Sequence, residues 1–136
     1  MEIPEMKTHV KLFQHWGAEK IRQGIKCSTI RPLPKRAQDW PKIGDVLDAR
    51  EWSGKPYRSK QVKIGRFTVS RVRKMRIETV LTFSSVWYFT NLAREEGFDS
   101  LDAMWQWFER EHGLPFEGLY IRFENWRGTA TPSLTP

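Results

Sequence analysis

The sequence has few of the residues that most often mark metal or disulfide chemistry. Its 136 residues include one cysteine, Cys27, and three histidines, His9, His15 and His112. A single cysteine excludes an internal disulfide and a zinc site with several thiolates, and the histidines are not spaced as a ligand pair. We therefore predict that the protein holds neither a metal ion nor another cofactor.

Several longer patterns are also missing. No stretch approaches the roughly 20 apolar residues of a membrane span, and the first ten residues lack the apolar run of a signal peptide. The chain has no glycine-rich phosphate loop and no G-x-S-x-G motif. These absences argue against a membrane protein, a nucleoside triphosphatase and the commonest serine hydrolases, and we expect a cytoplasmic location.

The composition is that of one globular domain. Hydrophobic residues make up 39% of the chain and aromatic residues 13%, including seven tryptophans, which is enough apolar surface for one core. Residues 127–136 have little to bury, and we predict that they form a disordered tail behind a domain spanning residues 8–126.

Positive charge is concentrated in one segment. The net charge is +7, and residues 50–76 contain ten Lys or Arg against one acidic residue, Glu51. Such a basic segment is typical of a surface that contacts a polyanion. The alternative is that these side chains line solvated strand edges, where positive charge discourages edge-to-edge pairing.

The hydrophobic pattern predicts an α+β domain. Extended segments are expected at residues 9–13, 28–31, 46–52, 61–72 and 119–126, with 75–81 as a further strand or a continuation. Helices are expected at 15–23, at 86–96, and after Gly97, where Asp99 or Ser100 caps the start and Gly113 ends the helix. A phase slip in the apolar alternation predicts a bulge near Gly65. Long strands with helices grouped late favour a small barrel over a parallel sheet.

The stretch G-I-K-C-S-T-I-R at residues 24–31 collects reactive side chains. Lys26 and Thr29 are three residues apart, so their side chains can meet, and a neutral lysine can take the proton of a threonine hydroxyl. By itself this Lys-x-x-Thr spacing is a weak signal that arises by chance in many proteins, and a polar turn between two elements is its more usual explanation. Cys27 lacks a visible base, and we interpret it as packing.

Taken together, three motifs resemble the ASCH domain family, a branch of the PUA-like β-barrels. They are G-x-K-x-x-T-I-R at residues 24–31, K-x-G-D at 42–45, and A-x-x-E-G-F at 93–98, and the similarity covers roughly residues 8–126. The resemblance implies a small β-barrel flanked by short helices, with a cleft commonly proposed to bind RNA. One branch of the family removes the acyl group of N4-acetylcytidine, using a threonine nucleophile, a lysine base and a glutamate.

Carried over to this sequence, the resemblance implies that Thr29 is the nucleophile, Lys26 the base and Glu96 the carboxylate, with Glu95 as the neighbouring candidate. Arg31, Trp52 and Tyr57 are predicted to contact substrate. The expected partner is RNA or a nucleoside. The alternative is a non-catalytic RNA-binding module or a ribonuclease that uses the same basic cleft. The residues predicted to contact nucleic acid are Lys55, Arg58, Lys60, Arg71, Arg73 and Lys74.

Overall fold

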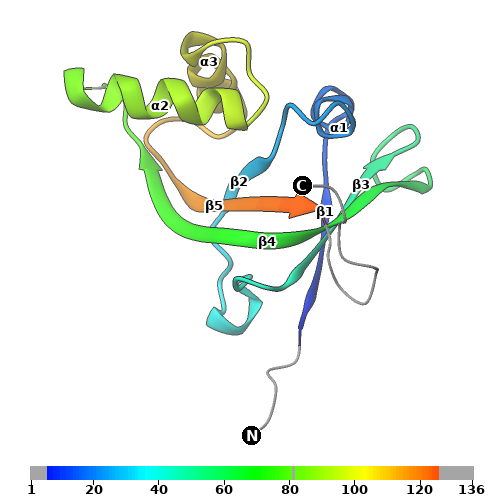
Figure 1. Cartoon of the computed structure of the whole chain (residues 1–136). Coiled ribbons are helices and arrows are strands. Elements are labelled where there is room, and N and C mark those ends of the chain that lie inside the picture. The colour runs from blue at the N-terminus through cyan, green and yellow to red at the C-terminus, as the bar shows by residue number, and fades with distance from the viewer. Residues whose placement is uncertain (1–5, 81, 126–136) are drawn as a thin grey trace, which may run out of the picture.

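The computed structural model describes residues 6–80 and 82–125 and has an α+β architecture (Figure 1). The predicted tail at residues 127–136 lies outside the described residues. The strands are β1 (Thr8–Leu12), β2 (Ser28–Pro32), β3 (Val46–Trp52), β4 (Gln61–Ile77) and β5 (Phe116–Asn125). The helices are α1 (His15–Arg22), α2 (Phe83–Glu95) and α3 (Leu101–Glu111), with a short 3₁₀ turn at Ala37–Asp39. Within residues 6–80 and 82–125, no helix is long and apolar enough to cross a membrane.

The local signals in the sequence located most of these elements. β3 covers the predicted residues, and the stretch after residue 72 continues β4 instead of forming a separate strand. Ser100 caps α3 by accepting a hydrogen bond from the backbone N–H of Ala103 at 3.0 Å, and Gly113 follows that helix with a φ of +80°. The side-chain cap and the glycine satisfy helix ends in the way their sequence positions predict.

All five strands form one sheet in the order β1-β3-β4-β5-β2, with β1 parallel to β3 and the other pairs antiparallel. The pairing between β3 and β4 shifts by one residue at Ala49 and Arg50, opposite Gly65, which confirms the predicted bulge. A second shift lies opposite β5, between Val69 and Arg71. Bulges increase twist and bend a strand, and Figure 1 shows β4 sweeping through a strong curve.

The sheet does not close into the predicted barrel. β1 and β2 are its two edges, and the described residues contain no backbone pairing between them. Instead, the side chain of Arg31 on β2 reaches the backbone carbonyl of Leu12 on β1, with Nη2 donating at 2.9 Å. The described link between these two edge strands is thus a side-chain hydrogen bond and not a backbone ladder. The seam therefore stays open.

Two apolar clusters hold the helices against the sheet. One joins α2 and α3 to the sheet through buried residues such as Leu92, Met104 and Phe108. The other lies beneath α1 and includes Phe13, Ile21 and Leu47. In Figure 1, α2 and α3 lie next to each other on one flank and α1 lies on the other, with β2 between them. This arrangement brings the end of α2 to the start of β2.

Candidate functional site

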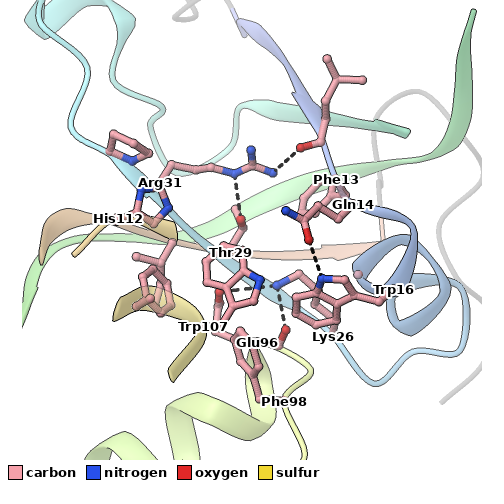
Figure 2. A pocket seen from close by; sticks show the side chains of 15 residues that line it. Phe13, Gln14, Trp16, Lys26, Thr29, Arg31, Glu96, Phe98, Trp107 and His112 are labelled. Carbon is pink, nitrogen blue, oxygen red and sulfur yellow. Dashed lines mark hydrogen bonds and ion pairs between the residues drawn. The ribbon is translucent and has the colours of Figure 1, made fainter. Parts of the chain in front are cut away.

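A cavity of about 200 Å³ lies where α1, β2 and the segment joining α2 to α3 meet (Figure 2). Its polar lining contains Lys26, Thr29, Arg31 and Glu96, which are separated by as many as 70 positions in the sequence. The open seam between β1 and β2 borders the same cavity through Leu12 and Arg31. The motif at residues 24–31 and its distant glutamate are thus parts of one site.

Lys26 is the buried centre of this site, with 6% of its side chain exposed. Its Nζ donates to the backbone carbonyl of Glu96 at 2.8 Å and lies 3.4 Å from the carboxylate oxygen Oε1 of the same residue. Burial lowers the pKa of Lys26, and the positive charge of Arg31 lowers it further, whereas the carboxylate of Glu96 opposes both effects. Desolvation disfavours a charged amine, so this environment promotes the neutral form that a base requires.

Glu96 occupies this position because α2 ends there. It is the C-cap of α2, and Gly97 follows with a φ of +92°, which turns the chain toward β2. The hydroxyl of Ser28 donates to the second carboxylate oxygen of Glu96, so both oxygens are engaged. A cation held at the last carbonyl of a helix is also favoured by the helix dipole.

The neighbouring Glu95 faces elsewhere. Its carboxylate accepts hydrogen bonds from the hydroxyl of Tyr120 at 2.5 Å and from Arg122 at 3.1 Å, and it does not line the cavity. Successive helical side chains point about 100° apart, so only one of the two glutamates can face Lys26. In this structure that residue is Glu96.

Replacement of Gly97 by alanine should destabilise the fold and disturb Lys26. An added Cβ would lie 3.2 Å from Cβ of Lys26 and 3.3 Å from Cβ of Lys20, in a backbone conformation that L residues rarely adopt. We expect a loss of about 1–3 kcal/mol in the free energy of unfolding, measured by urea denaturation. Gly24→Ala is the matched control, because Gly24 has a φ of +76° with nothing within 4 Å of an added Cβ. If both variants lost the same free energy of unfolding, the contact of the added Cβ with the two lysine side chains would not be the cause.

Thr29 and Arg31 lie on the same face of β2, two residues apart. Nε of Arg31 donates to the hydroxyl oxygen of Thr29 at 2.9 Å, and the guanidinium carbon lies 4.6 Å from the centre of the Phe13 ring. Lys26 and Thr29 line the same cavity without bonding to each other, and no described residue accepts the hydroxyl hydrogen of Thr29. That hydrogen is therefore available to a base.

The walls of the cavity are aromatic. Trp16, Phe98 and Trp107 form one cluster, with ring centres 4.9 Å apart for Trp16 and Phe98 and 5.8 Å apart for Phe98 and Trp107. Phe13 contributes on the other side of Lys26, whose Nζ lies 5.8 Å from its ring centre. Flat apolar walls of this kind suit a planar heteroaromatic ring. The sequence signals for these walls were Trp16, in the helix predicted before the Lys-x-x-Thr motif, and Phe98, within A-x-x-E-G-F.

Comparison with known proteins supports the same architecture. No family model matches the sequence, and no curated protein matches it. Among solved structures, a crystal structure of a ZmASCH mutant protein from Zymomonas mobilis aligns with a TM-score of 0.56 and 16% sequence identity. The alignment covers 90% of this chain and 71% of that one. The fold is ASCH-like.

Within this ASCH-like fold, the two aromatic residues predicted to bind substrate lie away from the cavity. Trp52 is the last residue of β3 and Tyr57 lies in the connection between β3 and β4, and their ring centres are 5.1 Å apart. Tyr57 is 87% exposed, and neither residue lines the cavity. Arg31 is the one predicted substrate contact that does.

The six predicted nucleic-acid contacts are exposed and lie outside the cavity. Three of them, Lys55, Arg58 and Lys60, lie in or beside the β3–β4 connection, and the other three lie on β4. Of the latter, Arg73 donates to the hydroxyl of Tyr88 at 2.5 Å and Lys74 pairs with Glu117 at 2.8 Å. None of the six lines the cavity. In this ASCH-like fold the predicted nucleic-acid contacts and the pocket are therefore separate.

Two other groups with potential chemistry have structural explanations. Cys27 is half-buried, and burial raises the pKa of its thiol, which disfavours the reactive thiolate. His15, Glu19 and Glu51 bring three potential metal-ligand atoms within 4.8 Å of one another. However, the guanidinium of Arg22 already contacts Glu19 at 2.6 Å and Glu51 at 2.8 Å, so a protein cation balances these carboxylates.

Proposed function

We propose that this protein is an amidohydrolase that removes the acyl group from the exocyclic amine of an N4-acylated cytidine or a related nucleoside. The observation that carries the proposal is the convergence of Lys26, Thr29 and Glu96 in one aromatic-walled cavity. A nucleophile beside a desolvated amine, which is in turn held by a third group, is the arrangement that acyl transfer requires.

The proposed reaction begins with attack of the Thr29 hydroxyl oxygen on the acyl carbonyl carbon, while its proton passes to Nζ of Lys26. The tetrahedral intermediate collapses, the bond between the acyl carbon and the nucleoside nitrogen breaks, and Lys26 returns the proton to that nitrogen. Water then hydrolyses the acyl ester on Thr29, releasing a carboxylic acid and the free threonine. The overall reaction consumes one water for each amide bond cleaved.

The neighbouring groups have supporting roles in this scheme. Glu96 holds Lys26 through its carbonyl and carboxylate, so the amine stays in place in either protonation state. Arg31 fixes the hydroxyl of Thr29 and brings positive charge to the region where the oxyanion develops. The cavity of about 200 Å³ is smaller than the roughly 300–1,000 Å³ of pockets for drug-sized ligands, which favours a single base or nucleoside.

The direct test is to incubate the purified protein with N4-acetylcytidine and related acylated nucleosides. Liquid chromatography with mass spectrometry would follow the deacylated nucleoside and the released acid. We expect turnover of at least one N4-acylated cytidine without added metal. No turnover across the whole panel by the folded wild-type protein would overturn the proposal.

The pH dependence of the reaction should report Lys26. Because the folded-state pKa of Lys26 is lowered, its neutral form becomes available below the ordinary lysine pKa of about 10.4. We expect kcat/KM to rise with pH and to level off before that value, since kcat/KM follows the ionisation of the free enzyme. A rate that falls as the pH is raised from about 7 to 10 would contradict Lys26 as the base.

As the alternative function, we propose RNA binding by the exposed cations of β4 and of the β3–β4 connection. Because these cations lie outside the cavity, we expect them to contact the sugar–phosphate backbone of RNA and not to recognise a single base. We expect the logarithm of the RNA affinity to fall linearly with the logarithm of the salt concentration, measured by fluorescence anisotropy. Charge reversal of Arg71, Arg73 and Lys74 should weaken binding, and an unchanged affinity would count against this function.

A further inference from the structure

One cation in the cavity lining, Arg31, makes no ion pair with another described residue. Glu96 is the one carboxylate in its lining, and Lys26 and Ser28 already occupy both of its oxygens. Over residues 6–80 and 82–125, neither Arg31 nor Lys11 has a carboxylate within ion-pair distance. Buried or half-buried charges are usually paired, so two cations without a carboxylate partner beside a pocket indicate an anionic ligand.

Arg31 has donors left for such a ligand. A guanidinium has five N–H groups, and the two described contacts of Arg31 go to neutral acceptors, the Thr29 hydroxyl and the Leu12 carbonyl. None of its nitrogen atoms is among the described buried side-chain atoms that lack a partner. Since Arg31 lines the cavity, its remaining N–H groups are not sealed inside the protein. They are free to donate to a group that enters the cavity.

Lys11 adds a second cation next to Arg31. It lies on β1 two residues before Phe13, and the backbone N–H of Phe13 continues the pairing with β3 by donating to the Arg50 carbonyl at 2.8 Å. Lys11 and Phe13 therefore project from the same side, and Arg31 stacks over the Phe13 ring. Lys11 is half-buried and outside the cavity lining, and both burial and the charge of Arg31 lower its pKa.

We propose that the cavity binds its ligand through an anionic oxygen group, a carboxylate or a phosphate, held by Arg31 and supported by Lys11. The chemical class of ligand is then an acylated nucleoside that carries a phosphate, or a reaction product that remains bound as a carboxylate. This identification of the ligand rests on the proposed deacylation, whereas the anion site itself rests on the unpaired charges. Arginine suits the role because its planar fork donates two parallel hydrogen bonds to either group.

The test uses binding, so it does not depend on turnover. The full chain labelled with ¹⁵N would be titrated with acetate, inorganic phosphate, cytidine and cytidine 5′-monophosphate at constant ionic strength, with chloride as the reference anion. The indole N–H signals of Trp16 and Trp107 report on the cavity, which both rings line. Constant ionic strength removes the general screening effect that any salt would have.

We expect acetate or phosphate to shift these signals saturably where chloride does not. If the anion is a phosphate, cytidine 5′-monophosphate should bind about tenfold or more tightly than cytidine, because charge-assisted hydrogen bonds are the strong ones. If it is a product carboxylate, acetate should bind while the two cytidine compounds bind alike. Lys11→Gln should lower the affinity for whichever anion shifts these signals several-fold. Lys55→Gln, which removes one charge outside the cavity lining, should leave that affinity unchanged.

The two proposals can fail separately. Anions that bind no better than chloride, together with equal binding of cytidine and its monophosphate, would overturn the anion site even in an active deacylase. Equal effects of Lys11→Gln and Lys55→Gln would also overturn it. Anion binding that depends on Lys11 in a protein with no deacylase activity would uphold the anion site and remove only the proposed reaction.

Discussion

Replacement of Thr29 by alanine should abolish deacylation, lowering kcat/KM by at least about 10³-fold, because Thr29 supplies the one hydroxyl among the described residues that line the cavity. Thr29 is buried, but its described polar contact is a single hydrogen bond from Arg31, so the variant should fold. Steady-state assays with the best acylated cytidine, together with far-ultraviolet circular dichroism, would separate loss of chemistry from loss of structure.

Thr29→Ser is the informative companion variant. It retains a hydroxyl at the same atom, so it should recover a measurable part of the activity that alanine loses. Thr90→Ala is the matched control, because Thr90 lies on α2 outside the cavity lining and bonds to the Val86 carbonyl at 2.7 Å. Activity of Thr29→Ala within about tenfold of the wild type would exclude Thr29 as the nucleophile.

Replacement of Glu96 by alanine should cause the largest loss of stability. Lys26 and Glu96 are 6% and 3% exposed, and the variant leaves a buried amine without its carboxylate and Ser28 without its acceptor. Removing one member of a buried ion pair typically destabilises a protein by about 3–5 kcal/mol. Urea denaturation at pH 7 would measure the difference. Glu117→Ala, which breaks the exposed pair with Lys74, is the control and should leave stability nearly unchanged.

The double variant Lys26→Met/Glu96→Gln separates stability from chemistry. It replaces the buried pair with groups of similar shape that carry no charge, and such replacements are often neutral or stabilising. We expect the free energy of unfolding to recover most of what Glu96→Ala loses, while deacylation stays absent because Lys26, the proposed base, has been replaced. A double variant that is as unstable as Glu96→Ala would mean that the charges are not the cause of the loss.

Local sequence signals predicted the elements well because the relevant interactions are local. Ser100 caps α3, Gly113 follows its end, and Val46–Trp52 forms the predicted strand. The bulge near Gly65 was also predicted, because a phase slip in the side-chain alternation is visible in the sequence. The predicted closed barrel was wrong, because closure requires β1 and β2 to pair, and no local sequence pattern shows whether two distant strands pair.

The same distinction applies to the candidate site: local spacing predicted part of it, and tertiary packing decided the rest. The sequence placed Lys26 and Thr29 within reach of each other, since three residues of chain limit their separation. The choice between Glu95 and Glu96 needed the direction in which α2 ends, and the aromatic walls needed the packing of α1 against α3. Trp52 and Tyr57 were chosen for their proximity to basic residues in sequence, but in the structure they contact each other.

By itself, the sequence determined the order of strands and helices, the basic segment and the spacing of the motif at residues 24–31. These features depend on periodicity, turn residues and charge, all of which act over a few residues. Only the tertiary structure decided that Glu96 contacts Lys26, that the Arg31 side chain reaches β1, and that the predicted nucleic-acid contacts lie outside the pocket. Each of these depends on contacts between residues far apart in the chain, and long-range packing decides which of them form.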